Sequence, residues 1–343
     1  MWLINTQTYK LEAIINPEPK SYAILSHTWG DGEISFAQYR KFYRAAKKNG
    51  LAWVLRRVRK RDGLHKILKT VEMARSRGLQ YAWVDTCCID KSSSDELSEA
   101  INSMFKWYAN ASVCFAYLSD LPTKEQIRKE LSVPASDADS DAANPDWHRD
   151  LDSPINKRWC QYFRRCRWFT RGWTLQELIA PRVLEFYDCQ WNTAGSKLAL
   201  RELIHDITHI TLRVLEDGTR LSSTPVAVRM SWAADRDTTR AEDMAYCLVG
   251  IFDLNMPFLY GEGDKAFIRL QEEICKQSAD LTLFAWVSQA RYPQSPREQY
   301  RGMFAKHVSE FKYCNSIYHG ISFLHALRHP YLPPFPAKAK TTA

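Results

Sequence analysis

The chain lacks several features that mark familiar classes of protein. Its 343 residues contain no run of about 18 apolar residues, the length that a membrane-spanning helix needs. The first residues, Met1 to Asn5, are not a basic segment leading into a long apolar run, so a secretory leader is not expected. The pattern G-x-x-x-x-G-K-S/T is also missing, which argues against a nucleoside-triphosphatase. We therefore expect a cytoplasmic protein without a membrane span.

Cysteine is present, but not in a pattern that builds a framework. There are nine cysteines, an odd number, and no two have the C-x-x-C spacing. Both facts argue against a set of disulfides and against a zinc ribbon. Cys87 and Cys88, with His27 and Asp85, would be the best candidates for a metal site or a cysteine nucleophile. Since ligand pairs at helical or knuckle spacing are lacking, we predict no metal.

The bulk composition is that of a globular protein. Hydrophobic residues make up 45% and charged residues 25% of the chain, which argues against disorder or a fibrous repeat over its whole length. Aromatic residues are numerous, with 12 Trp, 16 Tyr and 15 Phe. They indicate either clefts with aromatic walls or a core built largely from rings.

Positive charge is concentrated in one stretch. The formal net charge is +8, and residues 40–69 contain twelve Lys or Arg against one acid, Asp62. Such a patch could attract nucleic acid, a phosphorylated ligand or an anionic membrane surface. Apolar residues such as Trp53 and Leu64 interleave with the charges, however, as on the solvated face of amphipathic helices. We do not predict nucleic-acid binding from this patch.

Strands and helices alternate along the first half of the chain. Short apolar runs predict strands, and three- to four-residue apolar spacing predicts helices. The predicted strands are 22–25, 81–84, 113–118 and 183–187, and the predicted helices are 64–74, 97–108 and 168–178. Such alternation is typical of an α/β fold with a mostly parallel, flavodoxin-like sheet and flanking helices.

The remainder is organised differently. Residues 134–154 carry six aspartates among Ala, Ser and Pro, and we predict a mobile acidic insertion there. We expect residues 1–190, including this insertion, to form the first domain, and 191–287 to form a helical extension with helices over 198–207, 241–251 and 267–274. Residues 288–343 are predicted to be an irregular segment and tail.

Polar residues follow two of the predicted strands, where ligands of a parallel sheet bind. Ser26, His27 and Trp29 follow the first strand, while Asp85, Cys87 and Asp90 follow the second. Ser26 and His27 point to opposite faces if the strand continues through them, which disfavours a Ser–His nucleophilic pair. His27 is either a ligand donor or a structural histidine. The two acids would hold a ribose hydroxyl or polarise His27, or they are turn residues.

Several of these stretches resemble the heterokaryon incompatibility (HET) domain family of filamentous fungi. The matching blocks are Tyr22 to Gly30, Trp83 to Lys91, Tyr117 to Asp120 and Arg167 to Leu178, with a downstream segment at Met256 to Gly263 and Leu283 to Trp286. The resemblance covers roughly residues 20–190. It implies a cytoplasmic role in non-self recognition and programmed cell death after hyphal fusion, a form of fungal innate immunity, with self-association or another incompatibility protein as partner.

The family is regarded as distantly similar to TIR domains, some of which hydrolyse NAD. The run from Trp173 to Leu178 resembles the TIR segment that holds the catalytic carboxylate, which implies that Glu177 is catalytic and that Trp173 lies beside the ligand. NAD would then be a substrate, and the protein an NAD glycohydrolase. Two departures weaken this inference: Thr174 stands where TIR domains have cysteine, and the acidic insertion precedes the block. Glu177 could instead cap a helix or pair with Arg171 or Arg182, which leaves a non-catalytic signalling module as the alternative.

Overall fold

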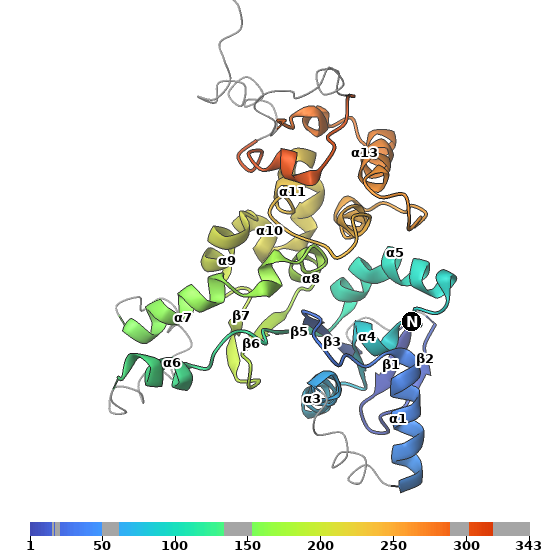
Figure 1. Cartoon of the computed structure of the whole chain (residues 1–343), viewed down its shortest axis with the longest axis vertical. Helices are drawn as coiled ribbons and strands as arrows, with labels where there is room; N and C mark the ends of the chain where they lie inside the picture. The colour runs from blue at the N-terminus through green and yellow to red at the C-terminus, as the bar shows by residue number, and fades with distance from the viewer. Residues whose placement is uncertain (16, 18–20, 50–61, 134–152, 289–301, 318–343) are drawn as a thin grey trace, which may run out of the picture.

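The computed structural model describes residues 1–15, 17, 21–49, 62–133, 153–288 and 302–317, and its centre is one seven-stranded sheet (Figure 1). The strand order is β2-β1-β4-β3-β5-β6-β7. The strands are β1 Trp2–Asn5, β2 Leu11–Ala13, β3 Tyr22–His27, β4 Tyr81–Trp83, β5 Val113–Tyr117, β6 Leu184–Tyr187 and β7 Thr193–Ser196.

The four inner strands confirm the predicted fold class. β4, β3, β5 and β6 are mutually parallel, and their order in the sheet follows the flavodoxin-like doubly wound pattern. β3 lies between β4 and β5, and all six of its residues are buried, as expected of a strand covered on both faces. The antiparallel strands β1, β2 and β7 were not predicted from the sequence.

Helices cover the sheet in Figure 1. In the first half these are α1 Phe36–Asn49, α3 Asp62–Ser76, α4 Asp85–Cys88, α5 Ser94–Asn110, α6 Lys124–Leu131, α7 Pro154–Arg164, η3 Arg167–Thr170 and α8 Thr174–Ile179. α3 packs against β3 and β4, whereas α8 packs against β3 and α5. Because the connections through α3 and α5 run in opposite directions along the sheet, right-handed crossovers put these helices on opposite faces.

The predicted single helix over 168–178 is wrong. The chain instead forms the 3-10 helix η3, breaks at Gly172 and starts again as α8. At the break the Gly172 amide donates to the Asp237 carbonyl at 2.9 Å, and the Asp237 amide donates to the Thr170 carbonyl at 2.6 Å. A Cβ on Gly172 would lie 2.5 Å from Thr238 Cγ2, so the close approach requires glycine. Pairing with a distant segment therefore overrides the local helical pattern.

The second half of the chain is helical, as predicted. Its elements are α9 Arg201–Thr208, α10 Leu212–Glu216, η4 Gly218–Ser223, α11 Val226–Ser231, α12 Asp243–Tyr246, η5 Val249–Phe252, α13 Lys265–Gln277, η6 Leu281–Phe284 and η7 Val308–Phe311. The predicted helix over 241–251 is divided into α12 and η5. Buried residues of both halves form one hydrophobic core.

Some predictions lie outside the described residues. They include the acidic insertion over 134–152, the middle of the basic patch at 50–61 and the tail from 318. In the part of the chain that the structure describes, no helix is long and apolar enough to cross a membrane.

We expect the packing of η5 on α5 to be sensitive to a single methyl group. A Cβ at Gly250 would lie 2.4 Å from Phe105 Cβ and 3.0 Å from Gln176 Oε1. Overpacking of this kind costs about 1–3 kcal/mol, so Gly250→Ala should lower the free energy of unfolding in urea by that amount. Gly302→Ala is the control, since a Cβ there meets nothing within 4 Å. Equal stability of the two variants would contradict the packing described.

Candidate functional site

The end of β3 separates two polar clusters. Ser26 and His27 are neighbours on this strand, so their side chains point to opposite faces of the sheet. Ser26 reaches Glu177 of α8, whereas His27 reaches Lys66 of α3. The sequence therefore predicted correctly that Ser26 and His27 do not form a nucleophilic pair. The side chains of His27 and Glu177 accordingly lie on opposite sides of β3.

The first cluster surrounds the carboxyl group of Glu177. The Ser26 hydroxyl donates a hydrogen bond to Glu177 Oε2, and Trp168 Nε1 donates to Ser26 Oγ at 2.7 Å. Tyr108 of α5 also bonds to Glu177, and its hydroxyl lies 3.0 Å from the Leu25 carbonyl oxygen. Ser26 is fully buried and Glu177 is 7% exposed. In this conformation the carboxyl group is sealed from bulk solvent.

Burial dominates the electrostatics of Glu177. It raises the pKa of the carboxyl group to about 8, and the nearby charge of Asp85 acts in the same direction. Hydrogen bonds from Ser26 and Tyr108 and the charge of Arg236 oppose this shift without cancelling it. At neutral pH the closed site therefore holds Glu177 mainly as a neutral acid.

Two buried cations hold the short helix α8 that carries Glu177. Arg236 donates to the Arg171 carbonyl at 2.8 Å and to Thr174 Oγ1 at 2.9 Å, next to the first turn. At the other end Lys197 Nζ donates to the carbonyls of Leu178 at 3.3 Å and Pro181 at 2.5 Å. The bonds from Lys197 satisfy carbonyl groups that the C-terminal end of a helix leaves without partners, whereas Arg236 fixes the segment that leads into the helix. Burial lowers the pKa of Lys197 to about 8 and that of Arg236 to about 10.

The second cluster is a chain of contacts through His27. Lys66 Nζ lies 2.9 Å from His27 Nδ1, and His27 Nε2 lies 3.0 Å from Asp85 Oδ1. An ammonium group can only donate, so Nδ1 accepts and Nε2 carries the proton that His27 donates to Asp85. Glu33 forms an ion pair with Lys66, and its Oε1 also lies 3.7 Å from His27 Nδ1. Both ring nitrogens of His27 are thus engaged, which indicates an orienting role.

Asp85 connects this cluster to an exposed indole. Its second oxygen accepts from Trp29 Nε1 at 2.7 Å, and Trp29 is 53% exposed. The ammonium of Lys91 lies 3.5 Å from the centre of the Trp29 ring, a cation–π contact. Burial acts to raise the pKa of Asp85, but bonds from His27 and Trp29 and the charge of Lys91 bring it below its ordinary value. Asp85 is therefore the ionised acid of the site.

The other predicted site residues lie apart from these contacts. Cys87 is fully buried in α4, and burial raises the pKa of its thiol well above the ordinary value. Asp90 accepts from the Ser92 amide at 3.1 Å and the Ser92 hydroxyl at 2.6 Å, as a turn residue does. Trp173 is partly buried and bonds to Asp243 of the second half.

Lys66 and Trp168 belong to the two clusters but were not predicted to be site residues. Lys66 was counted as part of the basic patch, although the helical spacing of Ile67 and Val71 predicted the helix that carries it. Trp168 was recognised within the matching block Arg167 to Leu178 but was not assigned to the site. Among the described residues, no group of three or more His, Cys, Asp or Glu side chains could hold a metal ion.

These features define an α/β protein whose polar side chains gather at the carboxyl end of β3. Residues 22–177 match the family model described as heterokaryon incompatibility protein (HET). This match contains β3, α4, α5 and Glu177 itself. The chain belongs to the HET domain family.

The comparison with curated proteins gives a particular homologue. The chain is 44% identical over 263 residues to vegetative incompatibility protein HET-E-1 of Podospora anserina. The alignment covers 76% of this chain but only 16% of that protein. Residues 265–328 match a domain of unknown function, DUF8212. No solved structure matches the chain.

The raised pKa of Glu177 predicts a pH-dependent effect of Glu177→Gln. Between the ordinary pKa of 4.5 and about 8, the folded protein binds a proton that the unfolded chain releases. The stability contributed by Glu177 is thus complete below about pH 4.5 and lost as pH rises to 8. Relative to the native chain, Glu177→Gln should gain on the order of 4 kcal/mol across this range. Urea unfolding at several pH values measures this, and a constant difference would contradict it.

The contact between Lys66 and His27 predicts a defined tautomer. Because Lys66 donates to Nδ1, the ¹⁵N spectrum of the native chain should show His27 protonated at Nε2 at neutral pH. In Lys66→Met, where Nδ1 has lost its donor, we expect a mixture of tautomers or a protonated ring. Lys69→Met is the control, since Lys69 pairs with Glu72 on the surface. Identical His27 signals in all three proteins would refute the orienting contact.

Proposed function

We propose that this chain is a signalling protein of vegetative incompatibility whose HET domain hydrolyses NAD, with Glu177 as the catalytic carboxylate. The family and the relative's name support the role in incompatibility. The observation that carries the enzymatic part is the position of Glu177. It lies beside Ser26 at the carboxyl end of β3, where parallel sheets bind ligands.

The chemistry needs one carboxylate. Breaking the bond between nicotinamide and ribose develops positive charge on the sugar, which an adjacent anion stabilises. Nicotinamide leaves with the bonding electrons, water attacks the sugar carbon, and the products are nicotinamide, ADP-ribose and a proton. Glu177 must lose its proton to act as this anion. In the closed structure, burial raises the pKa of its carboxyl group to about 8. Asp85, already ionised, acts on Glu177 through its charge and would add to the negative field that stabilises the cation.

Two indole rings, the exposed Trp29 and the partly buried Trp173, would receive the base. Trp29 is oriented by Asp85 and exposes half of its surface. Trp173 is held by Asp243 from the second half. An indole face in either position would stack on a nicotinamide or adenine ring. His27, fixed between Lys66 and Asp85, keeps Asp85 in place.

Turnover requires the sealed carboxyl group to become accessible. Glu177 is only 7% exposed and its partner Ser26 is fully buried, so substrate would reach the carboxyl group only after part of the surrounding structure moves. We propose that self-association, or contact with another incompatibility protein, causes this opening in the cytoplasm. The closed state would then keep the chain inactive until the trigger arrives.

The sealed site also favours a second candidate function. A carboxyl group that is 7% exposed and bonded to Ser26 is suited to joining α8 to the sheet. In that case the chain would be a non-catalytic module that signals by self-association or by recruiting a partner. Cell killing would then survive any change that preserves the Ser26–Glu177 contact.

Incubation of the purified chain with NAD tests the two functions. We expect nicotinamide release at high protein concentration, where self-association opens the site. Glu177→Gln, which keeps the shape and removes the charge, should lower the rate by at least about a hundredfold. Chromatographic detection of nicotinamide is the measurement.

The control is Glu185→Gln, which removes a carboxylate of β6 that is bonded to Arg77 and Tyr187. It should turn over NAD like the native chain. If the native chain releases no nicotinamide at any concentration and Glu177→Gln still kills cells, the enzymatic proposal is rejected in favour of the module.

A further inference from the structure

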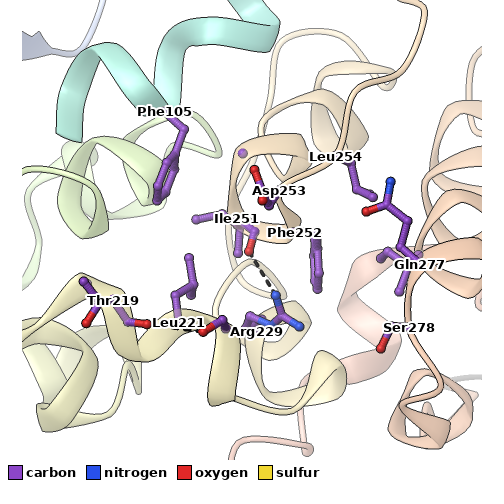
Figure 2. Close-up of a pocket in the computed structure, with 14 residues that line it drawn as sticks. Phe105, Thr219, Leu221, Arg229, Ile251, Phe252, Asp253, Leu254, Gln277 and Ser278 are labelled. Atoms are coloured by element: carbon purple, nitrogen blue, oxygen red, sulfur yellow. Dashed lines mark hydrogen bonds between the residues drawn. The ribbon is translucent and has the colours of Figure 1, made fainter. Parts of the chain in front are cut away.

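A hollow separate from these clusters lies where α5 meets the helical second half (Figure 2). Its volume is about 410 Å³, within the range of pockets that hold small molecules. Phe105, Leu221 and Ile251 form an apolar wall on one side. Arg229 of α11 lies at the floor, and Gln277 of α13 lies opposite the apolar wall. We call this hollow the Arg229 pocket.

The guanidinium of Arg229 is incompletely satisfied. One terminal nitrogen donates to the Ile251 carbonyl at 3.1 Å, and the group lies 4.5 Å from the centre of the Phe252 ring. Its Nε is buried and has no hydrogen-bond partner in the structure. Burial lowers the pKa of Arg229 to about 10, so the group remains charged at neutral pH. A half-buried cation of this kind costs free energy unless an anion accompanies it.

The neighbouring acids do not neutralise this charge by direct contact. The Asp280 carboxylate accepts from the amides of Val226 at 2.7 Å and Thr282 at 2.9 Å, although its charge acts on Arg229. Asp253 lies at the rim with an exposed side chain. Among the residues that the structure describes, no carboxylate forms an ion pair with Arg229.

We propose that the Arg229 pocket binds a small organic anion. Its acidic group, a carboxylate or a phosphate, would meet the guanidinium, and a flat apolar body would lie against Phe105, Leu221 and Ile251. An arginine stacked on an aromatic ring suits such groups, because its planar fork matches their oxygens. The volume leaves room for a fused ring system.

The position of the pocket gives the ligand a route to α8. Phe105 and Gly250 line it, and a Cβ built on Gly250 would lie 3.0 Å from Gln176 Oε1. Gln176 directly precedes Glu177 and also donates to Met104 Sδ at 3.3 Å. Binding of the anion to this pocket does not depend on NAD cleavage.

Matched probes test the proposal on the full chain. By saturation-transfer NMR we compare 2-naphthoate, 2-naphthyl phosphate and the neutral 2-naphthamide. We expect at least one of the two anions to bind about tenfold more tightly than the amide, and the stronger one identifies the acidic group. In Arg229→Met, which keeps the stem over Phe252, this preference should disappear. Arg220→Met, at an exposed arginine of η4, should keep it.

Three results would overturn the proposal. They are equal binding of the anions and the amide, binding unaffected by Arg229→Met, and no binding of any probe at millimolar concentration. Should Arg229→Met fail to fold, Ser222→Tyr provides a second variant. Ser222 lies exposed at the rim, so a tyrosine there narrows the pocket without contacting the core. Ser222→Tyr should abolish binding of all three probes. Unchanged binding would show that the probes bind outside the Arg229 pocket.

Discussion

The arrangement of the site depends on how α8 is anchored at both of its ends. This helix has six residues and every one is buried, so its terminal carbonyl groups cannot turn to water. Lys197 supplies donors at the C-terminal end, and Arg236 binds the Arg171 carbonyl and the Thr174 hydroxyl at the other end, so that two cations are buried. With those ends fixed, the side chain of Glu177 is held against Ser26. A neutral side chain in place of Lys197 would leave the carbonyl groups of Leu178 and Pro181 without this donor.

Glu177 and Asp85, which belong to the two clusters separated by the end of β3, have different protonation states. Glu177 lies on the face shared with α5 and α8, where burial stabilises the neutral form. Asp85 lies towards α3, where His27 and Trp29 both donate to it and stabilise the charged form. Two carboxyl groups near the end of one strand therefore differ in charge at the same pH. Such a division is a common property of sites that handle protons or stabilise charge.

Much of the fold could be predicted from the sequence because its inner strands are continuous apolar runs separated by strongly periodic helices. The antiparallel strands β1, β2 and β7 could not, since three or four residues give too little pattern to recognise. The break at Gly172 depends on Asp237, which lies far along the chain. In the site, Ser26 and Asp85 follow from their places after strands. Lys66 does not, because only its packing under His27 distinguishes it from neighbouring surface lysines.

The outer strands have a consequence for assembly. One margin of the sheet ends in β2, with three residues, and the other in β7, with four residues and an irregular register against β6. Short or distorted outer strands offer an incoming chain few free amide and carbonyl groups to pair with. Copies of this domain would therefore meet through helices and loops. Growth of one continuous β-sheet from molecule to molecule, as in amyloid fibres, is disfavoured at these two margins.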